Sequence, residues 1–79
     1  MKIIDCHGTG IGSSLSGPRW IVVRFVDGSW STGGTLEHWR RDAPDCEAYV
    51  VYGSDCDSAK KKAQRYRTRN KSTIESMQP

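Results

Sequence analysis

Basic side chains near the C-terminal end of the chain are the strongest candidates for a functional site. Residues 59–79 carry seven Lys and Arg against one acid, a balance of +6, whereas residues 1–58 carry five bases and eight acids, a balance of −3. Cations gathered on one short segment attract phosphate backbones or acidic protein surfaces. The alternative is a solvated helix face that only aids solubility. We predict a partner-binding surface made of Lys60, Lys61, Lys62, Arg65, Arg67 and Arg69.

A second basic group, Arg40 and Arg41, follows Trp39 directly. Trp and Arg are enriched among the residues that dominate binding energy at protein interfaces. We therefore add both arginines to the predicted partner-binding residues. The alternative is that Trp39 belongs to the core and the two arginines are solvated.

Acidic residues are also grouped along the sequence. They could form an acidic surface that pairs with a basic groove, or they could balance charge within the domain. This group comprises Asp42, Asp45, Glu47, Asp55 and Asp57.

Cysteine and histidine are too scattered to predict chemistry. Zinc needs four converging ligands, usually in close pairs, and a nucleophilic cysteine needs a base and an orienting group. We predict no metal, no cofactor and no catalytic residue, so the protein is not expected to be an enzyme. An odd number of cysteines favours reduced thiols in a cytoplasm over a disulfide framework, with one Cys pair as the alternative. These residues are Cys6, His7, His38, Cys46 and Cys56.

The glycine-rich segment Gly8–Ser14 does not match a phosphate-binding loop. Such a loop leads directly into a helix, whereas this one leads into a strand-like run. We interpret it as a connection between strands. The sequence also lacks a run of about 18 apolar residues, so no membrane span is expected.

The hydrophobic pattern predicts an α+β fold: an antiparallel sheet of about four strands with one C-terminal helix packed across a face. Asp27-Gly28 predicts a hairpin with a type I′ turn. The tryptophans, all between positions 20 and 39, should anchor the core. The expected strands are Lys2–Cys6, Arg19–Val26, Ser29–Thr32 and Glu47–Tyr52, with a short helical turn over Leu36–Arg41 capped by Thr35 and a final helix from about Asp57 to Arg69.

Small residues mark the inner face of the final helix. Ala59, Ala63 and Tyr66 recur at helical spacing and suit close packing on a sheet. Residues 71–79 are polar and lack a pattern. We predict a single compact domain over residues 1–70 and a flexible polar tail over residues 71–79.

In size and layout the chain resembles the small single-domain proteins that bacterial viruses make against host defences, in particular inhibitors of type I CRISPR complexes. The likeness covers the N-terminal Met1–Ile4 strand, the hairpin around Asp27-Gly28, and Tyr49–Tyr52 leading through Ser54–Ser58 into the basic helix. These inhibitors share no motif, so no functional residue is carried over. The resemblance implies action by binding, without catalysis. Many such inhibitors are acidic DNA mimics, and the positive net charge of this chain departs from that pattern.

The expected function is therefore that of a non-enzymatic phage inhibitor in the cytoplasm of a host bacterium. It would bind a CRISPR effector complex and block DNA binding or nuclease recruitment. The alternative is a small nucleic-acid-binding protein that uses its basic C-terminal helix. Monomer and homodimer both remain open.

Overall fold

Two apolar strands form the centre of a four-stranded sheet in the computed structural model, which describes residues 1–6 and 18–77. The strands are β1 (Lys2–Asp5), β2 (Arg19–Arg24), β3 (Trp30–Thr32) and β4 (Glu47–Tyr52), in the spatial order β1-β4-β2-β3. Both faces of β2 and β4 are apolar, as expected of strands covered on both sides. The glycine-rich segment Gly8–Ser14, predicted to connect two strands, lies outside the described residues.

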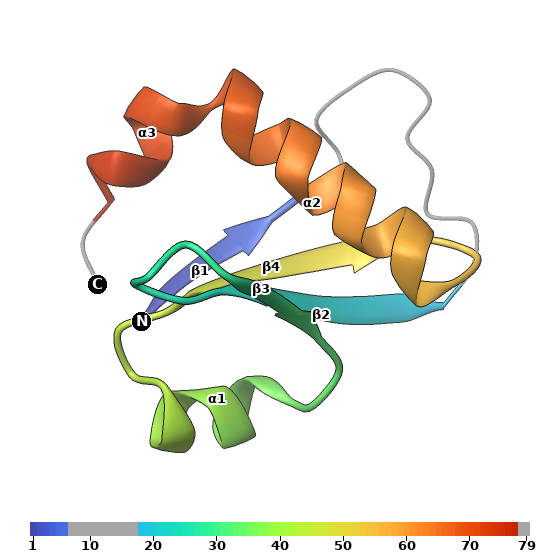
Figure 1. Ribbon diagram of the computed structural model, residues 1–79, viewed down its shortest axis with the longest axis horizontal. Coiled ribbons are helices and arrows are strands. Elements are labelled where there is room, and N and C mark those ends of the chain that lie inside the picture. The colour runs from blue at the N-terminus through green and yellow to red at the C-terminus, as the bar shows by residue number, and fades with distance from the viewer. Residues whose placement is uncertain (7–17, 78–79) are drawn as a thin grey trace.

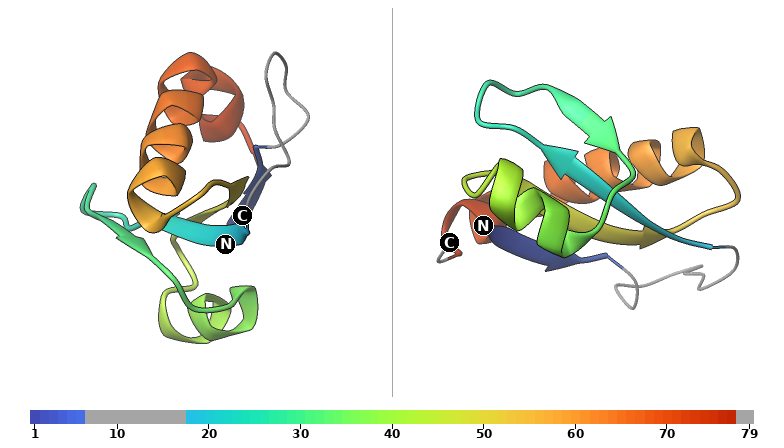
Figure 2. Two further views of the ribbon diagram at one scale, coloured as in Figure 1. Left: turned by 90° about the vertical axis from the view of Figure 1, so that its right-hand side faces the viewer. Right: turned by 90° about the horizontal axis from the view of Figure 1, so that it is seen from below.

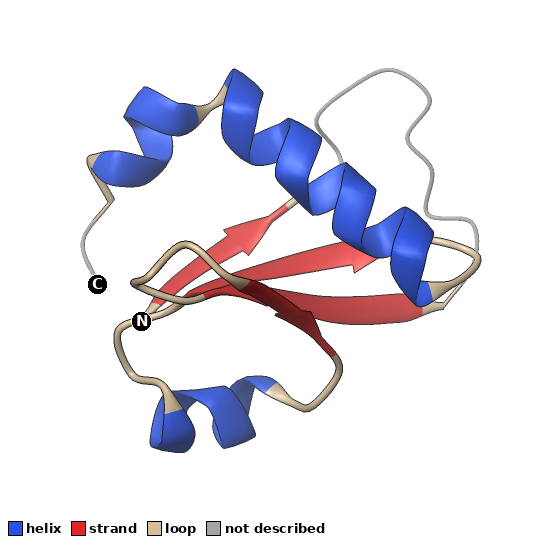
Figure 3. Ribbon diagram, in the orientation of Figure 1, coloured by secondary structure: helices blue, strands red, loops and turns tan. Residues whose placement is uncertain are grey.

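Helices cover the two faces of this sheet. Figures 1 and 3 show α2 (Cys56–Arg69) and α3 (Lys71–Glu75) on one side and α1 (Leu36–Asp42) on the other. The α+β class and the packing of the C-terminal helix on the sheet are as predicted. The short helix α1 is capped as predicted, because the Thr35 hydroxyl accepts a hydrogen bond from the His38 N–H at 3.0 Å.

The prediction of a purely antiparallel sheet is wrong for one strand pair. β2 pairs antiparallel with both β3 and β4, but β1 pairs parallel with β4, with Ile3 opposite Ala48. Neighbours in the chain are not always neighbours in a sheet. Because β4 is apolar on both faces, it occupies a central position between β1 and β2 rather than an edge.

The hairpin between β2 and β3 forms, but with a different turn. Gly28 N–H donates to the Phe25 carbonyl at 2.9 Å, and Phe25 N–H donates to the Ser29 carbonyl at 2.8 Å. Gly28 has φ of 93°, whereas Asp27 does not have a positive φ. This is the three-residue loop with a glycine bulge, not a type I′ turn. The Asp27 carboxylate instead accepts hydrogen bonds from the N–H and the hydroxyl of Ser29, and these two hydrogen bonds stabilise the turn.

The sheet separates two hydrophobic clusters. On the α2 side the cluster contains Ile4, Val22, Tyr49, Val51, Ala59, Ala63 and Ile74, and on the α1 side it contains Ile21, Val23, Cys46, Ala48 and Val50. The tryptophans pack against these clusters as predicted: Trp20 and Trp30 against the first, Trp39 against the second. Two of the indole groups also donate hydrogen bonds, that of Trp20 to the Gly53 carbonyl and that of Trp39 to the Gly33 carbonyl.

The prediction of a flexible tail is wrong for residues 71–77, which fold against the domain. Lys71–Glu75 forms α3, and Ile74 is 1% exposed within the cluster on the α2 side. Lys2 on β1 donates a hydrogen bond from Nζ to the Ile74 carbonyl at 2.9 Å, which satisfies a backbone acceptor near the end of α3. Within Lys71–Glu75 only Ile74 is apolar, and one apolar residue gives no periodic signal, so the sequence pattern missed this helix.

Candidate functional site

The basic helix α2 begins with a side-chain cap. The Asp55 carboxylate accepts a hydrogen bond from the Ser58 N–H at 2.8 Å. This hydrogen bond holds the pKa of Asp55 below its usual value. Asp57 in the first turn and Arg67 and Arg69 in the last turn suit the helix dipole. The predicted helix is therefore confirmed, one residue longer at its start.

Two alanines fix the orientation of α2 on the sheet. Ala59 and Ala63 are completely buried in the cluster on the α2 side, and Tyr66 packs against the same cluster. Because these residues face inward, positions on the opposite side of the helix face outward. The packing therefore determines which of the predicted cations can contact a partner.

Arg67 is the predicted cation that the fold turns inward. Its side chain is 16% exposed, and its Nε lies 3.0 Å from Oε1 of Glu47 on β4. Its Nη2 lies 3.8 Å from Oε2 of Glu75 on α3. Arg67 therefore joins three elements of the fold and is not part of an outward surface, which corrects its assignment as a partner-binding residue.

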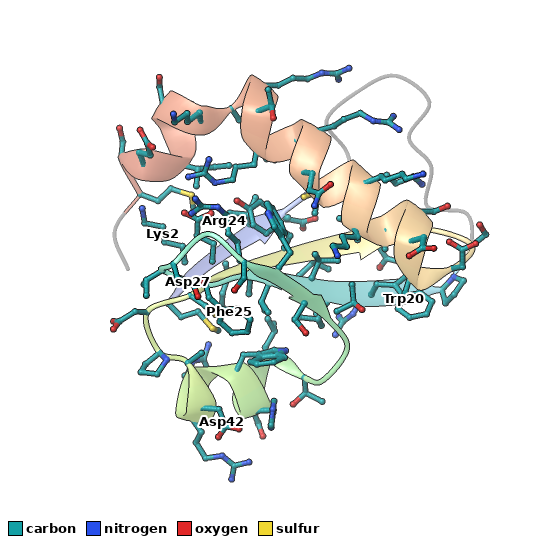
Figure 4. The ribbon with its side chains drawn as sticks, viewed as in Figure 1. Lys2, Trp20, Arg24, Phe25, Asp27 and Asp42 are labelled. Atoms are coloured by element: carbon teal, nitrogen blue, oxygen red, sulfur yellow. The ribbon has the colours of Figure 1, made fainter. Side chains whose placement is uncertain are left out.

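Glu47 is the centre of a polar network that the sequence analysis missed. The Tyr49 hydroxyl donates to Glu47 Oε1 at 2.6 Å, and Arg24 Nη1 lies 3.8 Å from Oε2. Burial alone would raise the pKa of the carboxyl, but the hydrogen bonds from Tyr49 and Arg67 outweigh it, so the pKa of Glu47 lies below its usual value. In Figure 4, Arg24 points to the α2 side and Phe25 toward α1.

A signal for the inward arginine was present in the sequence. Ala59, Ala63 and Arg67 are spaced at i, i+4 and i+8, so Arg67 continues the buried alanine row. A charged residue in such a row requires a buried partner of opposite charge. Glu47, at the start of the apolar strand β4, is that partner.

Three of the remaining cations form an outward row. Lys61, Arg65 and Arg69 are exposed at i, i+4 and i+8, and within residues 1–6 and 18–77 their side chains make no ion pair or hydrogen bond. Together with Gln64 and Thr68 they line a shallow, open depression of about 360 Å³. We call these five residues the outer face of α2.

The other two lysines lie beside this face. Lys62 is exposed and donates a hydrogen bond from Nζ to the Tyr52 carbonyl at 2.7 Å, so it is held toward the end of β4. Lys60 is half-buried. Both add positive charge near the outer face of α2 without belonging to the depression.

Arg40 and Arg41 lie on α1 and therefore across the sheet from α2. Figure 2 shows the two helices as separate outer layers with the sheet between them. Trp39 packs against the cluster on the α1 side and forms an edge contact with Phe25, with ring centroids 5.5 Å apart. The eight predicted residues are thus not one surface, and the tryptophan next to the arginines belongs to the core.

The acidic residues do not form one surface either. Asp42 and Asp45 precede β4, whereas Asp55 and Asp57 follow it, so the strand separates the two pairs. Figure 4 places Asp42 on α1, far from Trp20 at the end of the sheet where α2 begins. Glu47 is already engaged by Arg67. A continuous acidic surface, which a DNA mimic requires, is not assembled from these five residues.

The three cysteines lie in separate environments. Cys6 packs against the cluster on the α2 side and Cys46 lies in the other, while Cys56 is exposed at the start of α2. Burial, with a smaller effect of Asp5, raises the pKa of Cys6 to about 12, and burial also raises the pKa of Cys46. Both shifts disfavour the thiolate that a nucleophilic cysteine needs.

The described part of the chain contains neither a metal-binding cluster nor a helix that could span a membrane. His38 pairs with Asp42 at 3.3 Å on the exposed side of α1. Among residues 1–6 and 18–77, no three His, Cys, Asp or Glu side chains are grouped so as to hold a metal ion. Nor does any helix in these ranges combine the length and the apolar character needed to cross a membrane.

Comparison of the chain with models of known protein families, with curated protein sequences and with solved structures finds no match in any of the three. The resemblance to viral inhibitors of CRISPR complexes therefore stays a prediction.

Proposed function

We propose that the protein is a non-enzymatic binding protein that docks on an anionic macromolecule through the outer face of α2. The observation that carries this proposal is the row of Lys61, Arg65 and Arg69, three exposed cations whose charge no carboxylate of the described chain neutralises by direct contact. Exposed like charges on one helix repel each other, so a partner that supplies negative charge relieves that repulsion.

The shape of the surface favours a macromolecule over a small ligand. Pockets for small molecules are concave and mostly apolar, and they bury most of the ligand. The outer face of α2 is a shallow, open depression with long polar side chains. Such a surface makes contacts over a wide area and depends on charge for attraction.

Both partners expected from the sequence belong to this class. A CRISPR effector complex contains guide RNA, and a free nucleic acid exposes phosphates directly. Inhibition of such a complex in a host cytoplasm stays a prediction, and it would have to act through the cations of α2, since the acids do not form one surface.

Retention on immobilised heparin, a general polyanion, tests the docking surface. We expect the wild-type chain to elute at a clearly higher salt concentration than K61Q/R65Q. The matched control is R40Q/R41Q, which removes the same net charge from the opposite layer and should elute close to the wild-type protein. If the two double variants elute together, retention follows net charge alone and the proposed surface is wrong.

A further inference from the structure

We infer that the anionic partner is double-stranded DNA in the B form, and that its major groove receives the outer face of α2. This inference rests on the proposed function and specifies the partner of the same surface.

The side chains of this face are of the types that contact nucleic-acid backbones. Arg, Lys and Gln all donate hydrogen bonds to phosphate oxygens. The depression is lined by Lys61, Gln64, Arg65 and Arg69, together with Thr68, whose hydroxyl donates to the Gln64 carbonyl at 3.0 Å. Four residues of helix advance about 6 Å, so the three cations extend over about 12 Å. Each strand of B-DNA presents a phosphate about every 3.4 Å along the axis, so each cation can reach one.

A protein partner fits this face poorly. The buried centre of a protein interface is rich in aromatic and apolar residues, but the five residues lining the depression are all polar or charged. The apolar residues of α2, among them Ala59, Ala63 and Tyr66, instead pack into the cluster on the sheet. The face therefore offers charge and hydrogen bonds but no apolar anchor.

The outer face of α2 also lacks the aromatic side chains that usually bind single-stranded nucleic acid. Proteins that bind single strands stack the exposed bases on aromatic side chains. Tyr66 is the only aromatic residue of α2, and it packs against the buried cluster. A duplex needs no such platform, because its bases are already stacked on one another.

The shape of α2 distinguishes DNA from RNA duplexes. An α-helix with its side chains is about 10–12 Å across, and the major groove of B-DNA is about 12 Å wide. The major groove of A-form RNA is deep and narrow, so side chains cannot reach its bases. Figure 2 shows α2 along the outside of its layer, where the helix can approach a groove. Because single lysine and arginine contacts to phosphates carry no sequence information, binding should depend little on sequence.

Fluorescence anisotropy with labelled 20-base-pair DNA, one of its single strands, and the RNA duplex of the same sequence tests this inference. We expect the DNA duplex to bind at least tenfold more tightly than the other two. K61Q/R65Q should weaken duplex binding roughly 60-fold at 0.1 M salt, because each lost phosphate contact reduces the slope of log K against log salt concentration by about 0.9, counted from 1 M salt. R40Q/R41Q should weaken it much less. Thermal melting of both variants verifies that they are folded.

The groove is tested by competition. Methyl green, which occupies the major groove, should displace the protein, whereas the minor-groove ligand netropsin should not. Equal or tighter binding to the single strand or the RNA duplex would overturn the inference, and so would displacement by netropsin alone. If heparin retention depends on Lys61 and Arg65 but the DNA duplex is not preferred, the inference fails while the proposed docking surface stands. If neither heparin nor the DNA duplex distinguishes K61Q/R65Q from R40Q/R41Q, both the inference and the proposed docking surface fail.

Discussion

Nε of Arg67 on α2 lies 3.0 Å from Oε1 of Glu47 on β4, so Arg67 is on the side of the basic helix that faces the sheet. The side chain of Arg67 is 16% exposed and that of Glu47 is 12% exposed, so the pair is largely removed from water. Arg67 also approaches Glu75 on α3. One cation of the helix therefore stabilises the fold, whereas Lys61, Arg65 and Arg69 face solvent.

Replacing the buried carboxylate should make the protein less stable and less sensitive to acid. In E47Q the guanidinium of Arg67 loses its closest charged partner, so we expect the free energy of unfolding at pH 7 to fall by about 3 kcal/mol. The folded-state pKa of Glu47 lies below its usual value of about 4.5. Its stabilising contribution is therefore complete above pH 4.5 and is lost as pH falls through the lowered folded pKa.

Denaturant unfolding between pH 7 and pH 3 measures this effect. The wild-type protein should lose more stability than E47Q below pH 4.5, so the two curves should converge in acid. D57N provides a control, because Asp57 is an exposed carboxylate in the first turn of α2 without a buried partner. A wild-type curve parallel to that of E47Q throughout this range would show that Glu47 is not the linked group.

Truncating Ile74 should destabilise the whole domain. The side chain is 1% exposed and packs with Ala63 and Val22 in the cluster on the α2 side. Removal of a buried isoleucine side chain costs about 2–5 kcal/mol, so I74A should unfold at a markedly lower denaturant concentration. The exposed neighbour Thr73 gives the control, and T73A should change stability by less than about 0.5 kcal/mol. Equal stability of I74A and T73A would mean that α3 does not pack as described.

Enlarging Ala63 should force α2 away from the sheet. Ala63 is completely buried, so the additional carbon atoms of A63L have no space, and overpacking costs about 1–3 kcal/mol. T68L places the same side chain on the exposed side of the same helix and should alter stability only slightly. Chemical denaturation of both variants provides the measurement. A63L as stable as T68L would contradict the close packing of helix and sheet.

Local features of the fold were predictable because they depend on neighbouring residues. Thr35 and Asp55 have the chemistry of helix caps and form them, and glycine after Asp27 indicates a hairpin, although the type of turn differs. Ala59 and Ala63 correctly identify the buried side of α2.

Features that depend on distant contacts were not predictable in the same way. The parallel pairing of β1 with β4 follows from sheet order, which the hydrophobic pattern does not encode. α3 is held by Ile74 and by Lys2, which is 72 positions away in the sequence. In the candidate site, charge alone could not separate Arg67 from Arg65, because that distinction depends on which side of α2 faces the core. It could not show that Arg40 lies across the sheet either, because that depends on which face of the sheet each helix covers.

The salt dependence of DNA binding by wild-type protein and by R69Q tests the central claim most directly. Each phosphate contact contributes about −0.9 to the slope of log K against log salt concentration. Three contacts from Lys61, Arg65 and Arg69 predict a slope of about −2.7, and R69Q should reduce its magnitude by about 0.9, whereas R41Q should leave it unchanged. A slope near zero for the wild-type protein, or equal reductions in R69Q and R41Q, would contradict the docking of DNA on the outer face of α2.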